Sequence, residues 1–170
     1  MDGRSKIELM KLITRLQPQV KKINVLIDNT NYSIDIKDKL SENRYLLDKY
    51  INLNFIEAEC EYEILKKIKD MDEKNEALLI CGVFKDNNFY DYLNSEKFIN
   101  KIKSIKDIPI YTSREDYIGK GVIGGYIDIG SEYGKALGKM VLKIYKEEGI
   151  SSVPLITKLG AKLIKNLMNL

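Results

Sequence analysis

Short apolar runs alternate with longer amphipathic segments along most of the chain. The runs are rich in β-branched and aromatic residues, which indicates strands buried within a sheet. They cover residues 23–27 (INVLI), 53–58 (LNFIEA), 77–84 (ALLICGVF), 108–111 (IPIY) and 122–129 (VIGGYIDI). The run at 77–84 is the most continuous and predicts the central strand. The run at 53–58 alternates and then becomes charged, which favours a strand nearer the sheet edge.

Apolar residues recur at helical spacing between these runs. The spacing predicts helices over residues 5–16, 36–51, 62–71, 95–105 and 133–144. Ser5 and Ser95 are suited to cap the first and the fourth of these helices, and Pro18 ends the first. Strands and helices that alternate with short connections predict an α/β fold. We therefore expect a three-layer, doubly wound, mostly parallel sheet within a single domain over residues 1–170.

The last long helix has a predicted core face and two glycines on one side. The face consists of Tyr133, Leu137, Met140, Val141 and Ile144. Gly134 and Gly138 lie one turn apart and predict a close contact between this helix and the sheet. Further on, residues 153–157 predict an edge strand, and residues 158–170 predict a short amphipathic tail helix.

Polar residues follow several predicted strands, at the edge where open α/β sheets bind ligands. Asp28 and Asn29 come directly after the strand at 23–27. They either contact a ligand or only turn the chain and cap the next helix, and the sequence favours neither interpretation. A loop over residues 85–94 carries Phe89, Tyr90 and Tyr92. We expect these rings to pack over the sheet rather than to stack on a ligand.

A second polar loop, residues 112–116 (TSRED), follows the strand at 108–111. Its hydroxyls, arginine and carboxylates suit a zwitterionic or hydroxylated ligand, and they also suit the start of a short helix. Gly119, Gly121 and Gly124 match the dinucleotide pattern GxGxxG literally. The match is not between a first strand and its helix, so we do not expect a nucleotide. These glycines, with Gly125, instead predict positive φ angles and close backbone approach.

Composition excludes several classes of function. The chain has 28 basic and 25 acidic residues that are interspersed, which argues against nucleic-acid binding. It contains no histidine, the commonest general base and metal ligand, and we expect neither a metal nor a cofactor. Cys60 and Cys81 lie in or beside apolar runs, which predicts two buried free thiols. The N-terminal residues do not form a signal peptide, and no run is long enough to span a membrane.

The order of motifs in the second half of the chain resembles the C-terminal half of ABC-transporter substrate-binding proteins with the type I periplasmic-binding-protein fold. It is similar in particular to the branch that serves as an extracellular sensor domain of bacterial histidine kinases and diguanylate cyclases. The opening helix and residues 17–25 (QPQVKKINV) resemble the entry into that C-terminal lobe. The matching residues are Ile108, Pro109, Ser113, Glu115, Asp116, Gly121, Gly124, Gly125, Gly134 and Pro154.

This resemblance implies two lobes that close on an amino-acid-like or other small solute, of which this chain holds one. We therefore expect a separate domain or a truncated homologue whose partner is the missing N-terminal lobe. A permease or a fused signalling domain would read the closure. The oligomeric state stays open, a homodimer included, and the implied location is extracytoplasmic, periplasmic or tethered at the cell surface. The implied ligand contacts are Asp28, Asn29, Phe84, Ser113, Glu115 and Asp116.

Two other functions fit the residues less well. A signalling receiver domain would use Asp28 as phosphoacceptor, but no acidic pair precedes Asp28 in the sequence. An enzyme would use Glu115 and Asp116 as acid and base, but adjacent loop residues rarely point at the same atom, and no nucleophile–base pair is visible. The sequence therefore favours a binding domain that is not an enzyme.

Overall fold

The computed structural model describes residues 3–47, 49, 51–127, 130–148 and 162–165. Within them, one six-stranded sheet has the order β2-β1-β3-β4-β5-β6. The first five strands pair in parallel, and β6 pairs antiparallel with β5 at the edge. The strands are β1 (Lys22–Ile27), β2 (Asn52–Glu57), β3 (Glu76–Ile80), β4 (Ile110–Thr112), β5 (Gly124–Ile127) and β6 (Lys162–Lys165). The predicted mostly parallel sheet is confirmed, with β3 in its interior.

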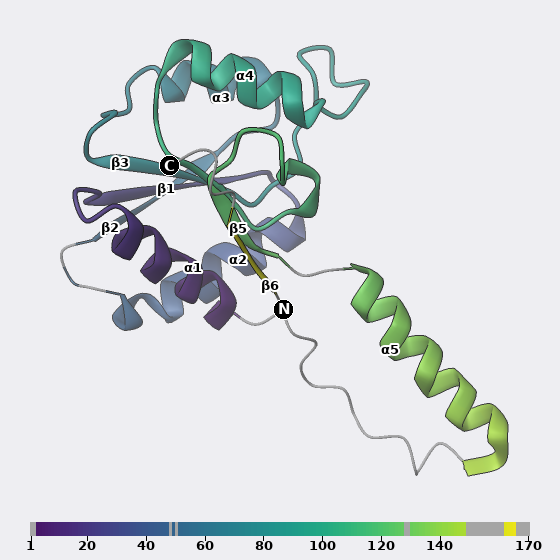
Figure 1. Cartoon of the computed structure of the whole chain (residues 1–170). Helices are drawn as coiled ribbons and strands as arrows, with labels where there is room; N and C mark the ends of the chain where they lie inside the picture. The colour runs from purple at the N-terminus through teal and green to yellow at the C-terminus, as the bar shows by residue number, and fades with distance from the viewer. Residues whose placement is uncertain (1–2, 48, 50, 128–129, 149–161, 166–170) are drawn as a thin grey trace.

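Helices cover both faces of the sheet, so the body has three layers (Figure 1). Helices α1 and α2 lie on one face, and α3 and α4 lie on the other. The helices are α1 (Gly3–Leu16), α2 (Asn31–Glu42), α3 (Glu61–Ile68), α4 (Ser95–Ile105) and α5 (Gly130–Lys143). Short 3₁₀ segments η1 (Arg44–Leu46) and η2 (Glu115–Tyr117) follow α2 and β4, and a π-helical segment η3 (Ile144–Glu148) extends α5.

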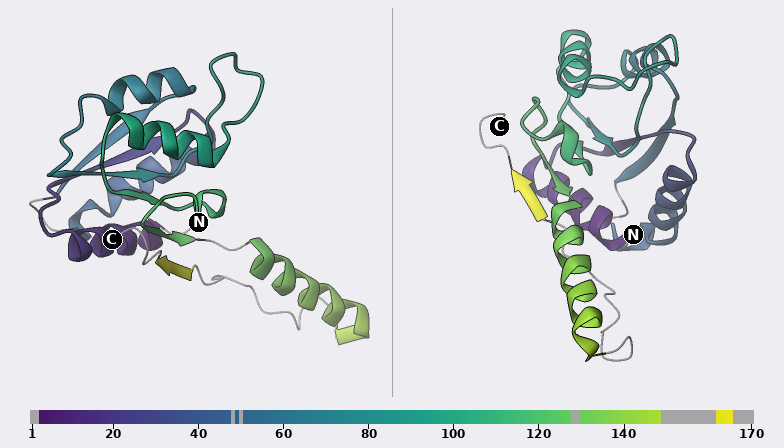
Figure 2. Two further views of the ribbon diagram at one scale, coloured as in Figure 1. Left: turned by 45° about the horizontal axis from the view of Figure 1, so that its top comes forward. Right: turned by 90° about the vertical axis from the view of Figure 1, so that its right-hand side faces the viewer.

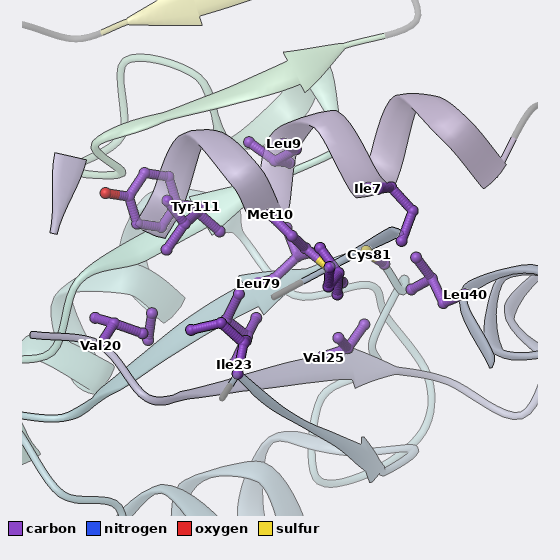
Figure 3. Packing of buried hydrophobic residues seen from close by; sticks show 14 of the residues in the cluster. Ile7, Leu9, Met10, Val20, Ile23, Val25, Leu40, Leu79, Cys81 and Tyr111 are labelled. Atoms are coloured by element: carbon purple, nitrogen blue, oxygen red, sulfur yellow. The ribbon is translucent and has the colours of Figure 1, made fainter. Parts of the chain in front are cut away.

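Two apolar cores hold the layers together, one on each side of the sheet. Figure 3 shows the first, where Ile7 and Met10 of α1 pack toward Val25 of β1 and Leu79 of β3. The neighbouring strand residues face the second core with α3 and α4, as Leu78 does. Because consecutive strand residues point to opposite faces, β1 and β3 are buried on both. This double burial explains why both strands read as continuous apolar runs.

Several helix ends differ from the predicted ones because capping residues decide them. Helix α1 includes Ser5, so this serine is not its N-cap. Asn94, rather than Ser95, caps α4 and accepts a hydrogen bond from the Lys97 amide. Helix α2 begins at residue 31, five residues earlier than predicted, because the Thr30 side chain accepts a hydrogen bond from the Ser33 amide. The first turn of α2 is mostly polar, so apolar periodicity did not reveal it.

Helix α5 leaves the body of the domain, as both views in Figure 2 show. The predicted core face is wrong where it is described: Leu137 is 58% exposed, and Val141 and Ile144 are exposed too. The predicted contact of Gly134 and Gly138 with the sheet is also wrong, since nothing lies within 4 Å of a Cβ built at either glycine. The periodicity is therefore that of a helix whose apolar face has no partner within the described chain.

The predicted tail helix is wrong over residues 162–165, which form β6. The remainder of that helix and the predicted edge strand at 153–157 lie outside the described residues. No helix among the described residues is long and apolar enough to cross a membrane. Cys60 and Cys81 are buried and free, as predicted.

The glycine-dense stretch has the predicted conformation. Gly119 and Gly121 have φ angles of +76° and +96°, in the region that disfavours other residues. A Cβ on Gly125 would lie 2.1 Å from the Thr112 carbonyl oxygen on the adjacent strand. Glycine at position 125 therefore lets β5 pass close beside the end of β4, which positions the 112–116 loop.

Candidate ligand-binding site

A cavity of about 570 Å³ lies at the carboxyl-terminal edge of the sheet. Loops that follow β1, β2 and β3 form its walls, because parallel strands end at the same edge. The lining residues are Asp28, Asn29, Thr30, Tyr32, Glu59, Val83, Lys85 and Tyr92. Charges of both signs and two tyrosines therefore converge on one cavity, which we call the edge pocket.

Asp28 ties two walls of the edge pocket together. One carboxylate oxygen accepts hydrogen bonds from the amide and the hydroxyl of Thr30, the former at 2.9 Å. The other accepts the Val83 amide at 2.7 Å. Burial by itself would raise the pKa of Asp28, but the hydrogen bonds from Thr30 and Val83 outweigh it and lower the pKa below its ordinary value. Asp28 therefore turns the chain and also lines the pocket, while its predicted contact with a ligand stays a prediction.

The amino-terminal end of α2 faces this cavity, since Thr30 and Tyr32 line it. Thr30 caps the helix, and the first turn carries no acidic residue. The ionised Asp28 carboxylate already occupies the positive end of this helix dipole, because it accepts the amide and the hydroxyl of Thr30.

Glu59 and Lys85 supply the other charges of the pocket. The Asn29 side-chain amide donates to a Glu59 carboxylate oxygen. The Lys85 backbone amide donates to the Glu59 carbonyl at 3.1 Å, and the Lys85 carbonyl accepts the Glu61 amide. Among the described residues, the Lys85 ammonium makes no ion pair, with Glu59 or otherwise. Neither residue was predicted as a contact, since each is a single charge in a loop with no motif around it.

Phe84 does not reach the edge pocket. Its side chain is 1% exposed and packs in the core, with its ring centroid 6.2 Å from that of Phe98. The predicted ligand contact of this ring therefore does not fit the structure. Side chains alternate in direction along this extended segment. Phe84 therefore faces the α3–α4 core, whereas the residues on either side of it, Val83 and Lys85, line the cavity.

The aromatic residues of the loop at 85–94 point outward. Phe89, Tyr90 and Tyr92 are 48%, 88% and 71% exposed, so the prediction that they pack over the sheet is wrong. Asp86 holds the loop in shape, because its side chain accepts the amides of Asn88 and Tyr90 and its own amide donates to the Asp91 carbonyl. The loop is thus closed by its own backbone, and only Tyr92 of the three rings lines the edge pocket.

The 112–116 loop lies at the same sheet edge but outside the lining of the edge pocket. Ser113 is buried next to the Cys81 thiol and makes no hydrogen bond of ordinary geometry through its hydroxyl. Glu115 and Asp116 are exposed in the first turn of η2, which confirms the predicted short helix. Asp116 pairs with the Arg114 guanidinium at 3.0 Å. The structure therefore brings Asp28 and Asn29 together and leaves Ser113, Glu115 and Asp116 as a separate group.

A larger groove of about 780 Å³ runs along the side of α3. Tyr62, Lys66 and Lys67 come from that helix, and Phe89 comes from the aromatic loop. Its walls are mainly one helix surface, whereas three strand-end loops enclose the edge pocket. No group of three or more metal-ligating side chains occurs in the described part of the chain. The edge pocket is therefore the better candidate for a small organic ligand.

The family model described as ABC transporter substrate binding protein matches residues 4–170 of this chain. None of the curated proteins compared with the chain matches it.

Solved structures share the fold over nearly the whole chain. A conserved domain protein from Vibrio cholerae has a TM-score of 0.61 at 17% identity, covering 94% of this chain and 52% of its own. An ABC domain from Streptococcus pneumoniae in complex with L-Trp has a TM-score of 0.63 at 18% identity, covering 95% and 52%. The ligand-free, open structure of a substrate-binding protein with adhesive properties from Clostridium difficile has a TM-score of 0.68 at 20% identity, covering 96% and 53%. The chain spans about half the length of these matched structures.

Proposed function

Because the chain belongs to the family of ABC transporter substrate-binding proteins, we propose that it is one lobe of a two-lobed module that binds a small, amino-acid-like solute. The observation that carries this proposal is the edge pocket, which lies where doubly wound sheets bind ligands. The family is one of solute-binding proteins, and we assign no catalytic step to this chain.

The chemistry of the edge pocket supports an amino-acid-like ligand. Two carboxylates, an ammonium group and two tyrosines line it, which suits a molecule with two charges and an apolar part. One structure that shares the fold contains L-Trp, so this amino acid is the first compound to test. Asn29 contributes an amide, and Asp28 fixes the loops after β1 and β3 to each other through the Val83 amide. Ser113, Glu115 and Asp116 would meet the ligand or the second lobe from the neighbouring loop.

Two observations support a second lobe as partner. The matched structures are about twice the length that this chain covers. Helix α5 also carries an exposed apolar face that nothing in the described chain covers. A soluble protein rarely leaves such a face in water, so another apolar surface would cover it. The second lobe, the N-terminal lobe of the family, would both close the edge pocket and receive α5.

Another protein would recognise the closed state that two lobes adopt around a ligand. The family supports an ABC permease as the protein that detects closure. It also supports an extracytoplasmic location for the binding module. A fused histidine kinase or diguanylate cyclase would use the same closure, which is the sensor variant of the proposal.

A thermal-shift screen of the 170-residue chain against amino acids and sugars tests the proposed function. A ligand at ten times its dissociation constant adds about 1.4 kcal/mol of stability. For a domain of this size, that raises Tm by roughly 3–6 °C. We expect such a shift with L-Trp or another amino acid, and none with sugars. The variant Lys66→Met, which alters only the groove along α3, should keep the shift. If no amino acid shifts Tm at tens of millimolar, about ten times the dissociation constant expected for one lobe, the proposal fails.

A further inference from the structure

We infer that Glu59 and Lys85 form a two-point clamp, in which Glu59 holds the ammonium group of a zwitterionic ligand and Lys85 holds its carboxylate. This inference rests on the proposed function and adds the orientation of the ligand in the edge pocket. Both residues line that pocket, and they come from the loops after β2 and β3.

Asp28, the more obvious anchor for an ammonium group, is already engaged. Its two oxygens together accept three hydrogen bonds, from the amide and hydroxyl of Thr30 and from the Val83 amide. A carboxylate has about four acceptor positions, so little capacity remains for a ligand. Asp28 is also only 5% exposed. The ammonium group must therefore find another anion in the pocket.

Glu59 meets that need. It is exposed, and the Asn29 side-chain amide donates to one of its carboxylate oxygens. This bond holds the carboxylate at the pocket while leaving acceptor positions free. An ammonium group bound there would make a charge-assisted hydrogen bond, which is stronger than a neutral one.

Lys85 offers the opposite charge. Within the described chain its ammonium has no anionic partner, although Glu59 is its backbone neighbour across a 3.1 Å hydrogen bond. A zwitterion would bridge the two separate charges. A simple anion would be repelled by Glu59, and a simple amine would leave Lys85 without a partner.

The tyrosines define where the rest of the ligand would lie. Tyr92 is 71% exposed and Tyr32 is 39% exposed, and both line the cavity. An aromatic ring gives a ligand a flat apolar surface to pack against. The clamp therefore favours α-amino acids with a large apolar or aromatic side chain over small or polar ones.

Three indole compounds separate the two halves of the clamp. L-tryptophan has both charges, tryptamine lacks the carboxylate, and indole-3-propionate lacks the ammonium group. Their affinities are measured by NMR titration for wild type, Glu59→Gln and Lys85→Met. We expect Glu59→Gln to weaken L-tryptophan and tryptamine about tenfold and to spare indole-3-propionate, since a lost charge-assisted bond is worth about that factor. Lys85→Met should weaken L-tryptophan and indole-3-propionate and spare tryptamine.

The controls distinguish failure of the clamp from failure of the proposed function. Lys66→Met should change none of the affinities, and all variants should keep the wild-type Tm, since the three residues are exposed. If L-tryptophan binds but the two pocket variants affect the three compounds alike, or not at all, the clamp is overturned and the binding function stands. If wild type binds none of the compounds and no amino acid in the screen, the proposed function fails and the clamp fails with it.

Discussion

Both carboxylate oxygens of Asp28 accept hydrogen bonds from the protein itself, and this single residue connects the loop after β1 to the loop after β3. A buried carboxylate with several donors stays ionised because those bonds favour its charged form. The position of Asp28 after an apolar run predicted a turn or a ligand contact. Its long-range bond to the Val83 amide was not predictable, since 55 residues separate the two in the sequence.

Asp28 should make the stability of the domain depend on pH. Its pKa is lowered in the folded state, so its contribution is complete above the unfolded value of about 3.8 and is lost as pH falls through the folded pKa. Asp28→Asn should cost about 1.5–3 kcal/mol near pH 7, the range for hydrogen bonds to a charged group. Urea unfolding at pH 7 and pH 3 measures this difference. A gap between wild type and variant that stays the same at both values would contradict the assignment.

Gly125 is required by the close approach of β5 to β4. Gly125→Ala should destabilise the domain by about 3 kcal/mol, because a backbone carbonyl 2.1 Å from the new Cβ cannot rotate away. Gly134→Ala is the matched control: it lies in an exposed helix with open space around it, where alanine is favoured by up to about 1 kcal/mol. Thermal unfolding of both variants checks the contrast. Equal Tm values would show that β4 and β5 do not meet as described.

At the scale of elements, apolar periodicity predicted α5 correctly as a helix but not what covers it. Leu137 and Val141 recur at the spacing of a buried face, yet the structure leaves them exposed. Periodicity shows that a helix has an apolar face, but it does not identify the surface that packs against that face. Elements such as α1 were predictable because the sheet that they cover is part of this chain, as Met10 in the first core illustrates.

Paired substitutions test whether α5 packs on the body. Val141→Gln on α5 should change the free energy of unfolding by less than about 0.5 kcal/mol, as expected for an exposed position. Met10→Gln on α1 should lower the free energy of unfolding by about 3 kcal/mol or more. The substitution buries a polar amide in the core, where the Met10 side chain is fully inaccessible to solvent. Urea unfolding at micromolar concentration gives both values. A comparable loss for the two variants would mean that α5 is covered within the chain.

At the scale of the whole molecule, the mostly parallel sheet and its layers could be predicted because they follow from alternating apolar runs and amphipathic helices. The site could be predicted only in part. The sheet edge and residues 28 and 29 were found because polar residues follow a buried strand. Glu59, Lys85 and Tyr92 depend on how three loops meet in space, which no local pattern records. Ser113 and Glu115 lie at the same edge but in a different loop, so sharing an edge did not place them in one cavity.

A ¹⁵N–¹H NMR titration of the 170-residue chain with L-tryptophan tests most directly whether the edge pocket binds an amino acid. We expect saturable shift changes centred on the residues that line it, at 28–32, 59, 83, 85 and 92, with a millimolar dissociation constant because one lobe encloses the ligand on one side. The helix residues of the α3 groove, Lys66 and Lys67 among them, should stay unchanged. An absence of shifts at saturating ligand, or shifts that map to the α3 groove instead, would contradict the account.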